Sequence, residues 1–184
     1  MKSKDQLRKK FYTLRKKKYF EVSSSYFSPL LSLLNNTLKK KPIYLSSYYP
    51  SNYEVDTLKI FELIKSKKNI TSLLPSVSSK NMKFYKWRPL DSLSVNKYGM
   101  LDPSETKNNI IPNVVLVPLL AFDKNNHRLG YGKGYYDKFL NKYLNTNKNI
   151  LTIGVAFSFQ KYNKLPTSNF DFKLNYILTE NGLN

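Results

Sequence analysis

The sequence predicts an α/β fold in which helices flank a largely parallel central sheet in layers. Apolar segments with the length of buried strands alternate along the chain with segments whose apolar residues recur at helical spacing. The chain has 184 residues, a length that fits one domain. No internal repeat, low-complexity linker or break in composition divides it. We therefore expect residues 1–184 to form a single domain.

Two helices and a short strand are predicted first, for residues 4–18, 24–38 and 42–46. In the first helix Leu7, Phe11 and Leu14 recur at helical spacing, so one face can be buried while the lysines stay in solvent. Pro29 interrupts the second helix.

A third helix is predicted to begin at Ser51. A serine that is followed three residues later by a glutamate, here Glu54, is typical of the capping box at a helix N-terminus. An apolar stripe from Val55 to Ile64 follows this pattern and supplies a face for burial.

The remaining predicted elements are a helix at residues 134–144 and strands at residues 70–74, 82–87, 114–122, 150–157 and 174–178. Residues 82–87 alternate between apolar and polar side chains, as a half-exposed strand does. Residues 114–122 are the most apolar run in the protein and predict a central strand covered on both faces. The segment 96–113 is polar and rich in turn residues, so no element is predicted there.

Composition excludes several kinds of chemistry. The chain contains no cysteine and one histidine. It therefore cannot hold a disulfide framework, a thiolate zinc site or an iron–sulfur cluster, and it has no cysteine nucleophile. A metal site built from several histidines is excluded as well. With 41% hydrophobic residues the chain can bury a core, so disorder of the whole chain is not expected.

The formal charge of +19 arises from 31 Lys and Arg residues against 12 Asp and Glu residues. A basic surface gains affinity for nucleic acid by displacing counterions from phosphates. However, only four of the basic residues are arginine, the residue that reads guanine edges and clamps phosphates. Twenty asparagines accompany the lysines, and A/T-rich codons favour both residue types. A solvated, lysine-rich surface therefore explains the charge better than a dedicated nucleic-acid-binding surface.

The sequence also indicates where the protein acts. No stretch approaches the roughly 20 apolar residues that a membrane helix needs. The basic segment at residues 1–18 is not followed by an apolar run or a small-residue cleavage site, so it lacks the pattern of a signal peptide. We expect a soluble, cytoplasmic protein with no membrane partner.

Half of the six glycines lie in one turn, at Gly130, Gly132 and Gly134, between the most apolar strand and a helix. Alternating glycines permit positive φ angles and close approach of the backbone, so several N–H groups can point at one anion. The following helix adds unpaired N–H donors, and Arg128 and Lys133 add two cations. We interpret this turn as a phosphate-binding loop rather than a plain turn, although it has neither the P-loop nor the Rossmann spacing.

Residues 128–137, Arg-Leu-Gly-Tyr-Gly-Lys-Gly-Tyr-Tyr-Asp, resemble the ATP loop of the 5-formyltetrahydrofolate cyclo-ligases, also called methenyltetrahydrofolate synthetases. Further matches to this family follow in family order and span almost the whole chain: Lys4-x-x-Leu7-Arg8, Glu54-Val55-Asp56-Thr57, Met82-x-Phe84-x-x-Trp87, Asn96-x-x-Gly99 and Val117-Pro118. The resemblance implies a NagB/RpiA/CoA-transferase-like fold. It also implies an enzyme that uses ATP and Mg²⁺ to convert 5-formyltetrahydrofolate to 5,10-methenyltetrahydrofolate, releasing ADP and phosphate by way of a phosphorylated formyl intermediate.

The resemblance assigns a set of residues to each substrate. Those for ATP are Lys4, Arg8, Arg128, Leu129, Gly130, Tyr131, Gly132, Lys133, Gly134, Tyr135 and Tyr136. Those for the folate are Arg8, Tyr49, Glu54, Met82, Phe84, Trp87, Tyr131, Gly132, Lys133, Gly134 and Tyr135. Within these sets we expect Arg128 and Lys133 to be catalytic, because they can stabilise the charge of the transferring phosphoryl group.

Several of the residues that the resemblance assigns to folate binding can also be explained by a structural role alone. In the family, the glutamate that matches Glu54 holds the pterin ring, whose N–H donors suit a carboxylate, whereas the alternative is capping of its own helix. The residues for which plain packing is the alternative are Tyr49, Met82, Phe84 and Trp87.

Asp137 and Asp171 match metal-binding aspartates of the family, and Mg²⁺ prefers carboxylates together with substrate phosphates. For Asp137 the alternative is a favourable interaction with the helix dipole. The motif around Asp171 is looser, because the chain has Asn175 where the family often has another acid. Asp102 also precedes a proline where the family usually has glutamate.

Two other functions remain open from the sequence. One is a different ATP-dependent phosphoryl-transfer enzyme with the same glycine loop, and the other is a basic nucleic-acid-binding protein. The cyclo-ligase is favoured because phosphoryl transfer depends on positioning and charge stabilisation, and so needs neither a histidine base nor a thiol. We expect a monomer whose partners are small molecules.

Overall fold

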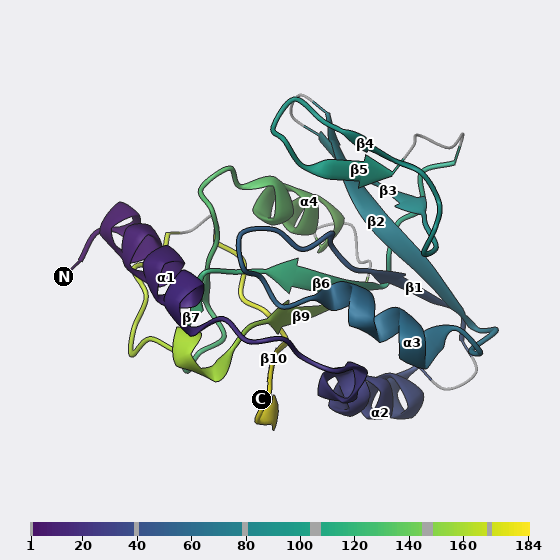
Figure 1. The fold of residues 1–184 in the computed structure, drawn as a ribbon, viewed down its shortest axis with the longest axis horizontal. Coiled ribbons are helices and arrows are strands. Elements are labelled where there is room, and N and C mark those ends of the chain that lie inside the picture. The colour runs from purple at the N-terminus through teal and green to yellow at the C-terminus, as the bar shows by residue number, and fades with distance from the viewer. Residues whose placement is uncertain (1, 39–40, 79–80, 104–107, 145–148, 169–170) are drawn as a thin grey trace.

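A seven-stranded sheet forms the centre of the molecule, and helices cover both of its faces (Figure 1). This computed structural model describes residues 2–38, 41–78, 81–103, 108–144, 149–168 and 171–184. The strands lie in the order β11-β10-β9-β6-β1-β2-β3. Their bounds are Ile43–Ser46 (β1), Ile70–Ser78 (β2), Asn81–Lys86 (β3), Val114–Pro118 (β6), Leu151–Val155 (β9), Tyr176–Thr179 (β10) and Gly182–Leu183 (β11).

The inner strands of this sheet are parallel and the two edge strands are antiparallel. β1 pairs in parallel with β2 and β6, and β9 pairs in parallel with β6 and β10. β3 and β11 each close an antiparallel hairpin at an edge. Parallel sheets are covered on both faces by their crossover helices, and β6 is accordingly fully buried from Val114 to Val117. The predicted α/β fold is confirmed, with β6 as its central strand.

The α-helices of the described residues are α1 (Lys4–Lys18), α2 (Ser28–Thr37), α3 (Ile60–Ile64) and α4 (Tyr135–Leu144). α2 and α3 cover one face of the sheet, where Leu34 and Ile60 share a core with Leu116. α4 covers the other face, where Leu140 shares a core with Val115. Because neighbouring residues of a strand point to opposite faces, β6 contributes to both cores.

α1 packs against a small hairpin rather than against the sheet. Two short strands form this hairpin and span Ala121–Phe122 (β7) and Arg128–Leu129 (β8). Figure 1 shows α1 beside β7. Leu7 and Phe11 of α1 are buried with Leu129 in a third core. The bounds of the helix match the prediction, but its buried face differs: Leu14 is half-buried, whereas Arg15 is only 1% exposed.

The predicted strand at residues 114–122 is shorter than expected. β6 ends at Pro118, and the backbone N–H of Leu120 then donates to the carbonyl oxygen of Leu129 at 2.7 Å. The apolar run therefore continues, but its hydrogen bonds pass from the central sheet to β8. Apolarity alone does not reveal such a change of partner.

The helix predicted to begin at Ser51 is wrong. Residues 51–54 form a turn in which Asn52 and Tyr53 have φ angles of 50° and 62°. Helical structure begins only with a 3₁₀ turn at Thr57–Lys59, which Asp56 caps through its side chain, and continues into α3.

The helix predicted at residues 24–38 is divided. A 3₁₀ turn spans Ser24–Phe27, and α2 begins directly after it, with Pro29 in its first turn. Proline favours the first turn of a helix because no intrahelical partner is lost there. Pro29 thus starts this helix instead of interrupting it.

A second small hairpin, which the sequence did not predict, lies above β2 and β3 (Figure 1). Its strands are β4 (Leu93–Val95) and β5 (Leu101–Pro103). The buried carboxylate of Asp102 accepts hydrogen bonds from Ser76 Oγ and the N–H of Val77, both at 3.0 Å, and thereby ties the hairpin to β2. Within the described residues, no helix has the length and apolarity to cross a membrane.

Candidate functional site

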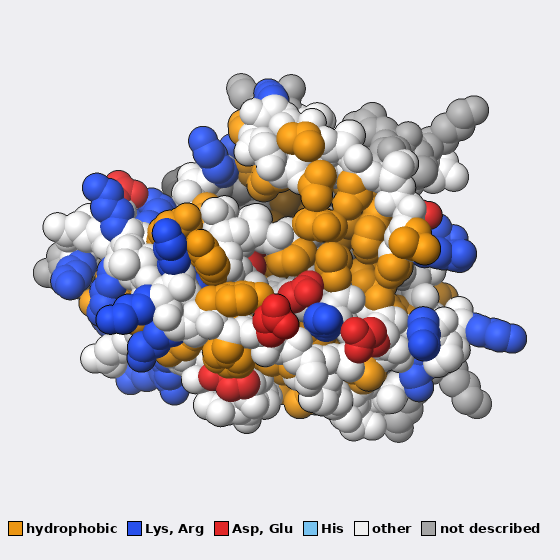
Figure 2. Space-filling model, in the orientation of Figure 1, with side chains coloured by type: hydrophobic (Ala, Val, Ile, Leu, Met, Phe, Trp, Pro, Cys, Tyr) orange, Lys and Arg blue, Asp and Glu red, His pale blue; other side chains and the backbone are white. Residues whose placement is uncertain are grey.

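A cavity of about 880 Å³ opens beyond the carboxyl ends of β1 and β6, between α1, the β4–β5 hairpin and residues 128–137. Ligands of open α/β sheets bind at this edge. Figure 2 shows a hollow with hydrophobic walls on this face, and lysine and arginine side chains gathered over α1. Its lining residues are Lys4, Arg8, Tyr48, Tyr49, Ser51, Asn52, Glu54, Pro75, Val77, Met82, Tyr98, Met100, Leu101, Asp102, Pro118, Arg128, Leu129, Gly130, Tyr131, Gly132, Lys133, Gly134, Tyr135, Tyr136, Asp137, Lys138, Asn141 and Asp171.

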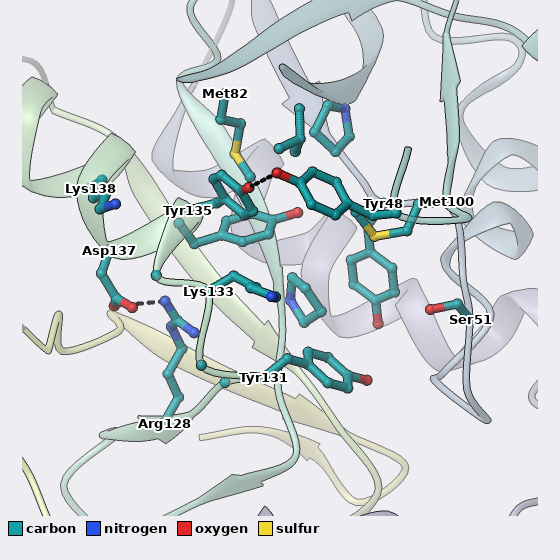
Figure 3. A pocket seen from close by; sticks show the side chains of 18 of the residues that line it. Tyr48, Ser51, Met82, Met100, Arg128, Tyr131, Lys133, Tyr135, Asp137 and Lys138 are labelled. Carbon is teal, nitrogen blue, oxygen red and sulfur yellow. Dashed lines mark hydrogen bonds and ion pairs between the residues drawn. The ribbon is translucent and has the colours of Figure 1, made fainter. Parts of the chain in front are cut away.

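The glycine loop, residues 130–134, forms one side of this cavity. Gly132 and Gly134 have φ angles of +94° and +69°, a region that residues with a Cβ rarely adopt. α4 begins immediately after the loop, so its unpaired N–H groups lie at the same place. Lys133 is exposed and extends its ammonium into the middle of the cavity (Figure 3).

Arg8 of α1 lies directly against the glycine loop. Its Nε donates to the carbonyl oxygen of Gly130 at 3.0 Å, and its Nη1 forms an ion pair with Asp5 Oδ1 at 2.5 Å. A Cβ atom on Gly132 would lie 3.1 Å from Arg8 Cζ. Glycine at this position therefore permits the close approach of the guanidinium as well as the backbone angle.

Arg128 and Asp137 form an ion pair at the other end of the loop. Arg128 Nη2 lies 2.7 Å from Asp137 Oδ1, and the Arg128 side chain is only 5% exposed (Figure 3). The N–H of Phe172 also donates to Asp137 Oδ1, at 3.4 Å. The partners found for Asp137 in the described structure thus use Oδ1, which leaves Oδ2 for a cation. This fits Mg²⁺, which is bound by one or two carboxylates together with phosphate oxygens and water.

Lys4 and Asp171 form a second ion pair, which joins α1 to the C-terminal part of the chain. Lys4 Nζ lies 2.5 Å from Asp171 Oδ2, which also accepts from the N–H and Oγ of Ser168. Burial would raise the pKa of Asp171, but these hydrogen bonds outweigh burial and lower it. Residues 169–170, which precede Asp171 in the predicted motif, lie outside the described residues. Among those described, no three His, Cys, Asp or Glu side chains gather as a metal site.

Glu54 lies in the turn after β1, buried at the cavity beside Tyr131 of the glycine loop, and both of its carboxylate oxygens have partners. Oε2 accepts from the N–H and Oγ of Ser51, and Oε1 accepts from the hydroxyl of Tyr131 at 2.6 Å. Only half of the predicted capping box forms, because the Glu54 N–H donates to the backbone carbonyl oxygen of Ser51 at 3.0 Å instead of to its side chain, and the pair closes a turn. Burial raises the pKa of Glu54, while the hydrogen bond from Tyr131 and the charge of Arg15 lower it.

One wall of the cavity is apolar and aromatic. Tyr98 from the β4–β5 hairpin and Tyr135 from the start of α4 meet at the rim, with their hydroxyl oxygens 2.8 Å apart. The hydrogen bond from Tyr135 lowers the pKa of Tyr98. Met82 and Met100 lie close to this pair (Figure 3). Sulfur and aromatic side chains make a surface that suits a flat ring.

The structure brings most of the predicted site residues to this one cavity. Those that line it are Lys4, Arg8, Tyr49, Glu54, Met82, the whole segment 128–137 and Asp171. Phe84 and Trp87 do not line it and are instead buried in the two main cores. Phe84 packs against Phe139 of α4, and Trp87 packs against Phe61 of α3. The structure thus shows packing for these two residues, and their contact with the folate stays a prediction.

Sequence reasoning missed Tyr98, Met100 and Arg15. Tyr98 and Met100 lie in a segment that had no predicted element, so nothing indicated where they would point. For Arg15 a signal existed: of the only four arginines in the chain, those at positions 8 and 15 contact the glycine loop, and the one at position 128 pairs with Asp137 in the first turn of α4. In a chain whose basic residues are almost all lysine, a retained arginine marks a place where guanidinium geometry is needed.

The arrangement combines three chemical functions in one cavity. The glycine loop with Lys133 and Arg8 suits a chain of phosphates, because amide N–H groups and cations converge there. The aromatic and methionine wall suits a flat ring, and Glu54 suits N–H donors on the edge of that ring. A cavity that holds a polyphosphate beside a flat heterocycle is suited to phosphoryl transfer between them.

Almost the whole chain matches the model of a known protein family. The model of the 5-formyltetrahydrofolate cyclo-ligase family matches residues 1–180. A 5-formyltetrahydrofolate cyclo-ligase of Mycoplasma genitalium is 36% identical over 137 residues, which cover 73% of this chain and 70% of that protein. One from Haemophilus influenzae is 29% identical over 140 residues, which cover 73% and 74%.

Solved structures agree with these sequence matches. The 5,10-methenyltetrahydrofolate synthetase of Aquifex aeolicus superposes with a TM-score of 0.75 at 29% identity, covering 98% of this chain and 91% of that one. The synthetase of Mycoplasma pneumoniae superposes with a TM-score of 0.69 at 26% identity, covering 96% and 98%. With its α/β fold, its glycine loop and these relatives, the chain is an enzyme that belongs to the 5-formyltetrahydrofolate cyclo-ligase family.

Proposed function

We propose that this enzyme converts 5-formyltetrahydrofolate to 5,10-methenyltetrahydrofolate, with ATP as co-substrate, with Mg²⁺ as cofactor and with release of ADP and phosphate. The observation that carries the proposal is the shared cavity, which is lined by the glycine loop with Lys133, by an aromatic wall and by Glu54. The family membership and the names of the relatives supply the substrate class.

The reaction that we propose has two steps. The formyl oxygen of the folate attacks the γ-phosphorus of ATP, so that an oxygen–phosphorus bond forms and the bond to ADP breaks. N10 of the folate then attacks the activated formyl carbon and loses its proton. The carbon–oxygen bond to phosphate breaks, and the methenyl bridge between N5 and N10 remains.

The residues divide between the two substrates by their place in the cavity. Lys133 and Arg8 lie where the triphosphate would meet the loop, and Lys133 is best placed to follow the transferring phosphoryl group because its ammonium reaches the centre of the cavity. Arg128 is held by Asp137 and contributes charge from the edge of the loop. Glu54 would accept hydrogen bonds from the pterin ring, and Tyr49 would lie against that ring.

Mg²⁺ would be held by Asp137 together with phosphate oxygens, and it would neutralise charge on the triphosphate. Asp137 is suited to this role because its interactions in the structure leave one carboxylate oxygen open. Asp171 already accepts hydrogen bonds from Lys4 and Ser168. We therefore propose that the main role of Asp171 is to hold Lys4 at the cavity, and that contact with the metal is a lesser role.

A direct assay tests the proposal. The purified protein is mixed with MgATP and 5-formyltetrahydrofolate, and the absorbance of the methenyl product is followed. We expect the wild type to turn over and Lys133→Ala to lower kcat/KM by about 100-fold or more, as the loss of a charge-stabilising group does. Lys65→Ala, which removes an exposed lysine outside the cavity, serves as the matched control and should change nothing.

Other results would point to the alternative functions. ATP hydrolysis with no methenyl product would indicate a different phosphoryl-transfer enzyme. Absence of both, together with tight and steeply salt-dependent binding of DNA or RNA, would favour a nucleic-acid-binding protein. Full activity of Lys133→Ala would remove Lys133 from the catalytic role.

A further inference from the structure

Arg15 is the most deeply buried cation of the described structure. It lies in the last turn of α1, and its side chain is 1% exposed. Nη1 donates to the carbonyl oxygen of Leu119 at 3.2 Å, just after β6, and Nη2 donates to the hydroxyl of Tyr131. The guanidinium carbon also lies 5.5 Å from the centre of the Tyr131 ring. Two of the contacts of this buried charge are therefore made with one tyrosine of the glycine loop.

A buried charge is costly unless an opposite charge compensates it. None of the ion pairs in the described part of the chain contains Arg15. The compensating carboxylate is one hydroxyl away, because the Tyr131 hydroxyl that accepts from Arg15 donates to Glu54 Oε1 at 2.6 Å. A hydrogen-bonded chain thus runs from α1 through the glycine loop to the turn after β1.

This chain of hydrogen bonds has only one possible direction. A guanidinium has donors and no acceptor, so the Tyr131 oxygen must accept from Arg15. The single hydroxyl proton of Tyr131 then points to Glu54, and the carboxylate must accept it. Ser51 fixes the other oxygen in the same way, through its backbone N–H at 2.9 Å. Both ends of the carboxylate are thereby held as acceptors.

We propose that Arg15 is a positioning residue for the reaction: acting through the Tyr131 hydroxyl, it orients the Glu54 carboxylate and keeps it ionised at the cavity. This proposal rests on the proposed function, which assigns the pterin ring to Glu54. A ring edge with N–H donors needs an acceptor, and a protonated carboxyl group at this position would present a donor instead. Arg15 touches no substrate in this scheme, since it does not line the cavity.

The groups around Glu54 explain why such support is needed. Burial raises its pKa, and the hydrogen bond from Tyr131, the charge of Arg15 and the hydrogen bonds from Ser51 oppose that rise. The neighbouring hydroxyls of Tyr48 and Tyr136 are themselves buried and have raised pKa values, so they stay neutral. Arg15 is therefore the cation that offsets the burial of Glu54.

The first experiment measures the ionisation of Glu54 without any substrate. The chain has five glutamates, so side-chain carboxyl carbons labelled with ¹³C can be followed by NMR against pH, with Glu54→Gln identifying the signal. We expect Arg15→Met and Tyr131→Phe each to raise the Glu54 pKa by about one unit, because a favourable charge or hydrogen bond is lost. Lys16→Met, which removes an exposed cation from the same helix turn, should leave it unchanged.

The second experiment measures the consequence for turnover. We expect the acidic limb of kcat/KM for 5-formyltetrahydrofolate to move to higher pH by the same amount in Arg15→Met and in Tyr131→Phe. The double variant should move it no further than Tyr131→Phe alone, because both substitutions break one chain. Methionine keeps most of the volume of the aliphatic part of the arginine side chain, so Arg15→Met should disturb the packing little. If Arg15→Met does not fold, the result for Tyr131→Phe alone tests the proposal.

Three outcomes separate the possibilities. An unchanged Glu54 pKa in Tyr131→Phe overturns the proposal. A lower melting temperature in Arg15→Met with an unmoved pH profile also overturns it, since Arg15 would then be structural only. If the NMR shifts appear but the wild type makes no methenyl product, the coupling of Arg15 to Glu54 stands and the proposed function fails.

Discussion

At the scale of single residues, the glycines of the loop differ in what each one permits. Gly132 and Gly134 both have positive φ angles, but a Cβ would approach Arg8 only at Gly132 and would meet open space at Gly134. The first substitution therefore affects both the backbone and the position of a cation, whereas the second affects the backbone alone.

This difference gives a prediction. We expect Gly132→Ala and Gly134→Ala each to lower the free energy of unfolding by about 1–2 kcal/mol, the cost of placing a Cβ in the left-handed region. Gly132→Ala should in addition weaken ATP binding several-fold more than Gly134→Ala does, because it displaces the Arg8 guanidinium. Denaturant unfolding and calorimetric titration with MgATP measure the two effects. Equal loss of ATP affinity in both variants would show that the contact between Gly132 and Arg8 has no role.

The site residues were predictable where their chemistry is visible in sequence. The clustering of three glycines in a chain with six indicated the phosphate side of the cavity. Glu54 was found through its family motif. The same glutamate, three residues after Ser51, also led to the wrong prediction of a helix start, because a serine–glutamate pair can close a turn as well as cap a helix. Arg15 was missed despite the rarity of arginine in this chain, because a basic residue in a lysine-rich helix is typical of a solvated face.

At the scale of elements, the β4–β5 hairpin depends on one buried carboxylate. Besides its contacts with β2, Asp102 accepts a hydrogen bond from Asn96 Nδ2 at 2.9 Å. Asp102, which stands where the family usually has the longer glutamate, thus accepts hydrogen bonds on both of its carboxylate oxygens. Tyr98 and Met100 lie between the two strands that Asp102 holds, so this carboxylate also sets one wall of the cavity.

We expect Asp102→Ala to loosen the hairpin selectively. The buried N–H of Val77 would lose its partner, which costs about 1–3 kcal/mol locally. Amide hydrogen exchange over residues 93–103 should become faster, and KM for the folate should rise while ATP binding changes little. Asp91→Ala is the matched control, since Asp91 also accepts a backbone N–H in this region but is exposed. Unchanged exchange in Asp102→Ala would contradict the anchoring role.

The helices and strands that could be predicted from the sequence are those with long apolar runs or a clear helical periodicity. β6 and α4 were found because long apolar runs and helical periodicity are strong signals. The β4–β5 hairpin was missed because its strands have three residues each, too few to show a clear alternating pattern. The end of β6 was misplaced because the next apolar residues pair with β8, and this choice of partner depends on tertiary structure.

At the scale of the whole molecule, the charge is large and unevenly distributed. The formal net charge is +19, and Figure 2 shows lysines and arginines gathered over α1 on the face that it draws. Like charges on a compact surface repel one another, and salt screens this repulsion over about 10 Å at 0.1 M.

We therefore expect the free energy of unfolding to rise by about 1 kcal/mol between low and physiological ionic strength, as for the weak interactions of surface charges. For a chain of this length this corresponds to about 2–4 °C in Tm. Scanning calorimetry in sodium chloride measures the shift, and sulfate is avoided because it can occupy the phosphate loop. A Tm that falls with added chloride would show that attractive pairs outweigh the repulsion.

The fold class followed from the order of helices and strands, and the family followed from the motifs. The assembly of the cavity did not follow, because it depends on how distant segments meet. α1 contacts both the glycine loop and the C-terminal part of the chain, and no local pattern encodes either contact.

The ion pair between Lys4 and Asp171 joins residues that are 167 positions apart in the sequence. During synthesis Lys4 therefore leaves the ribosome long before its partner exists. Most strands of the central sheet precede Asp171 and can pair earlier, but α1 gains this attachment beside the cavity only when translation has passed Asp171. A chain released before that point would lack this ion pair together with β10 and β11, and α1 would be held beside the cavity only by its contacts with the glycine loop and the β7–β8 hairpin.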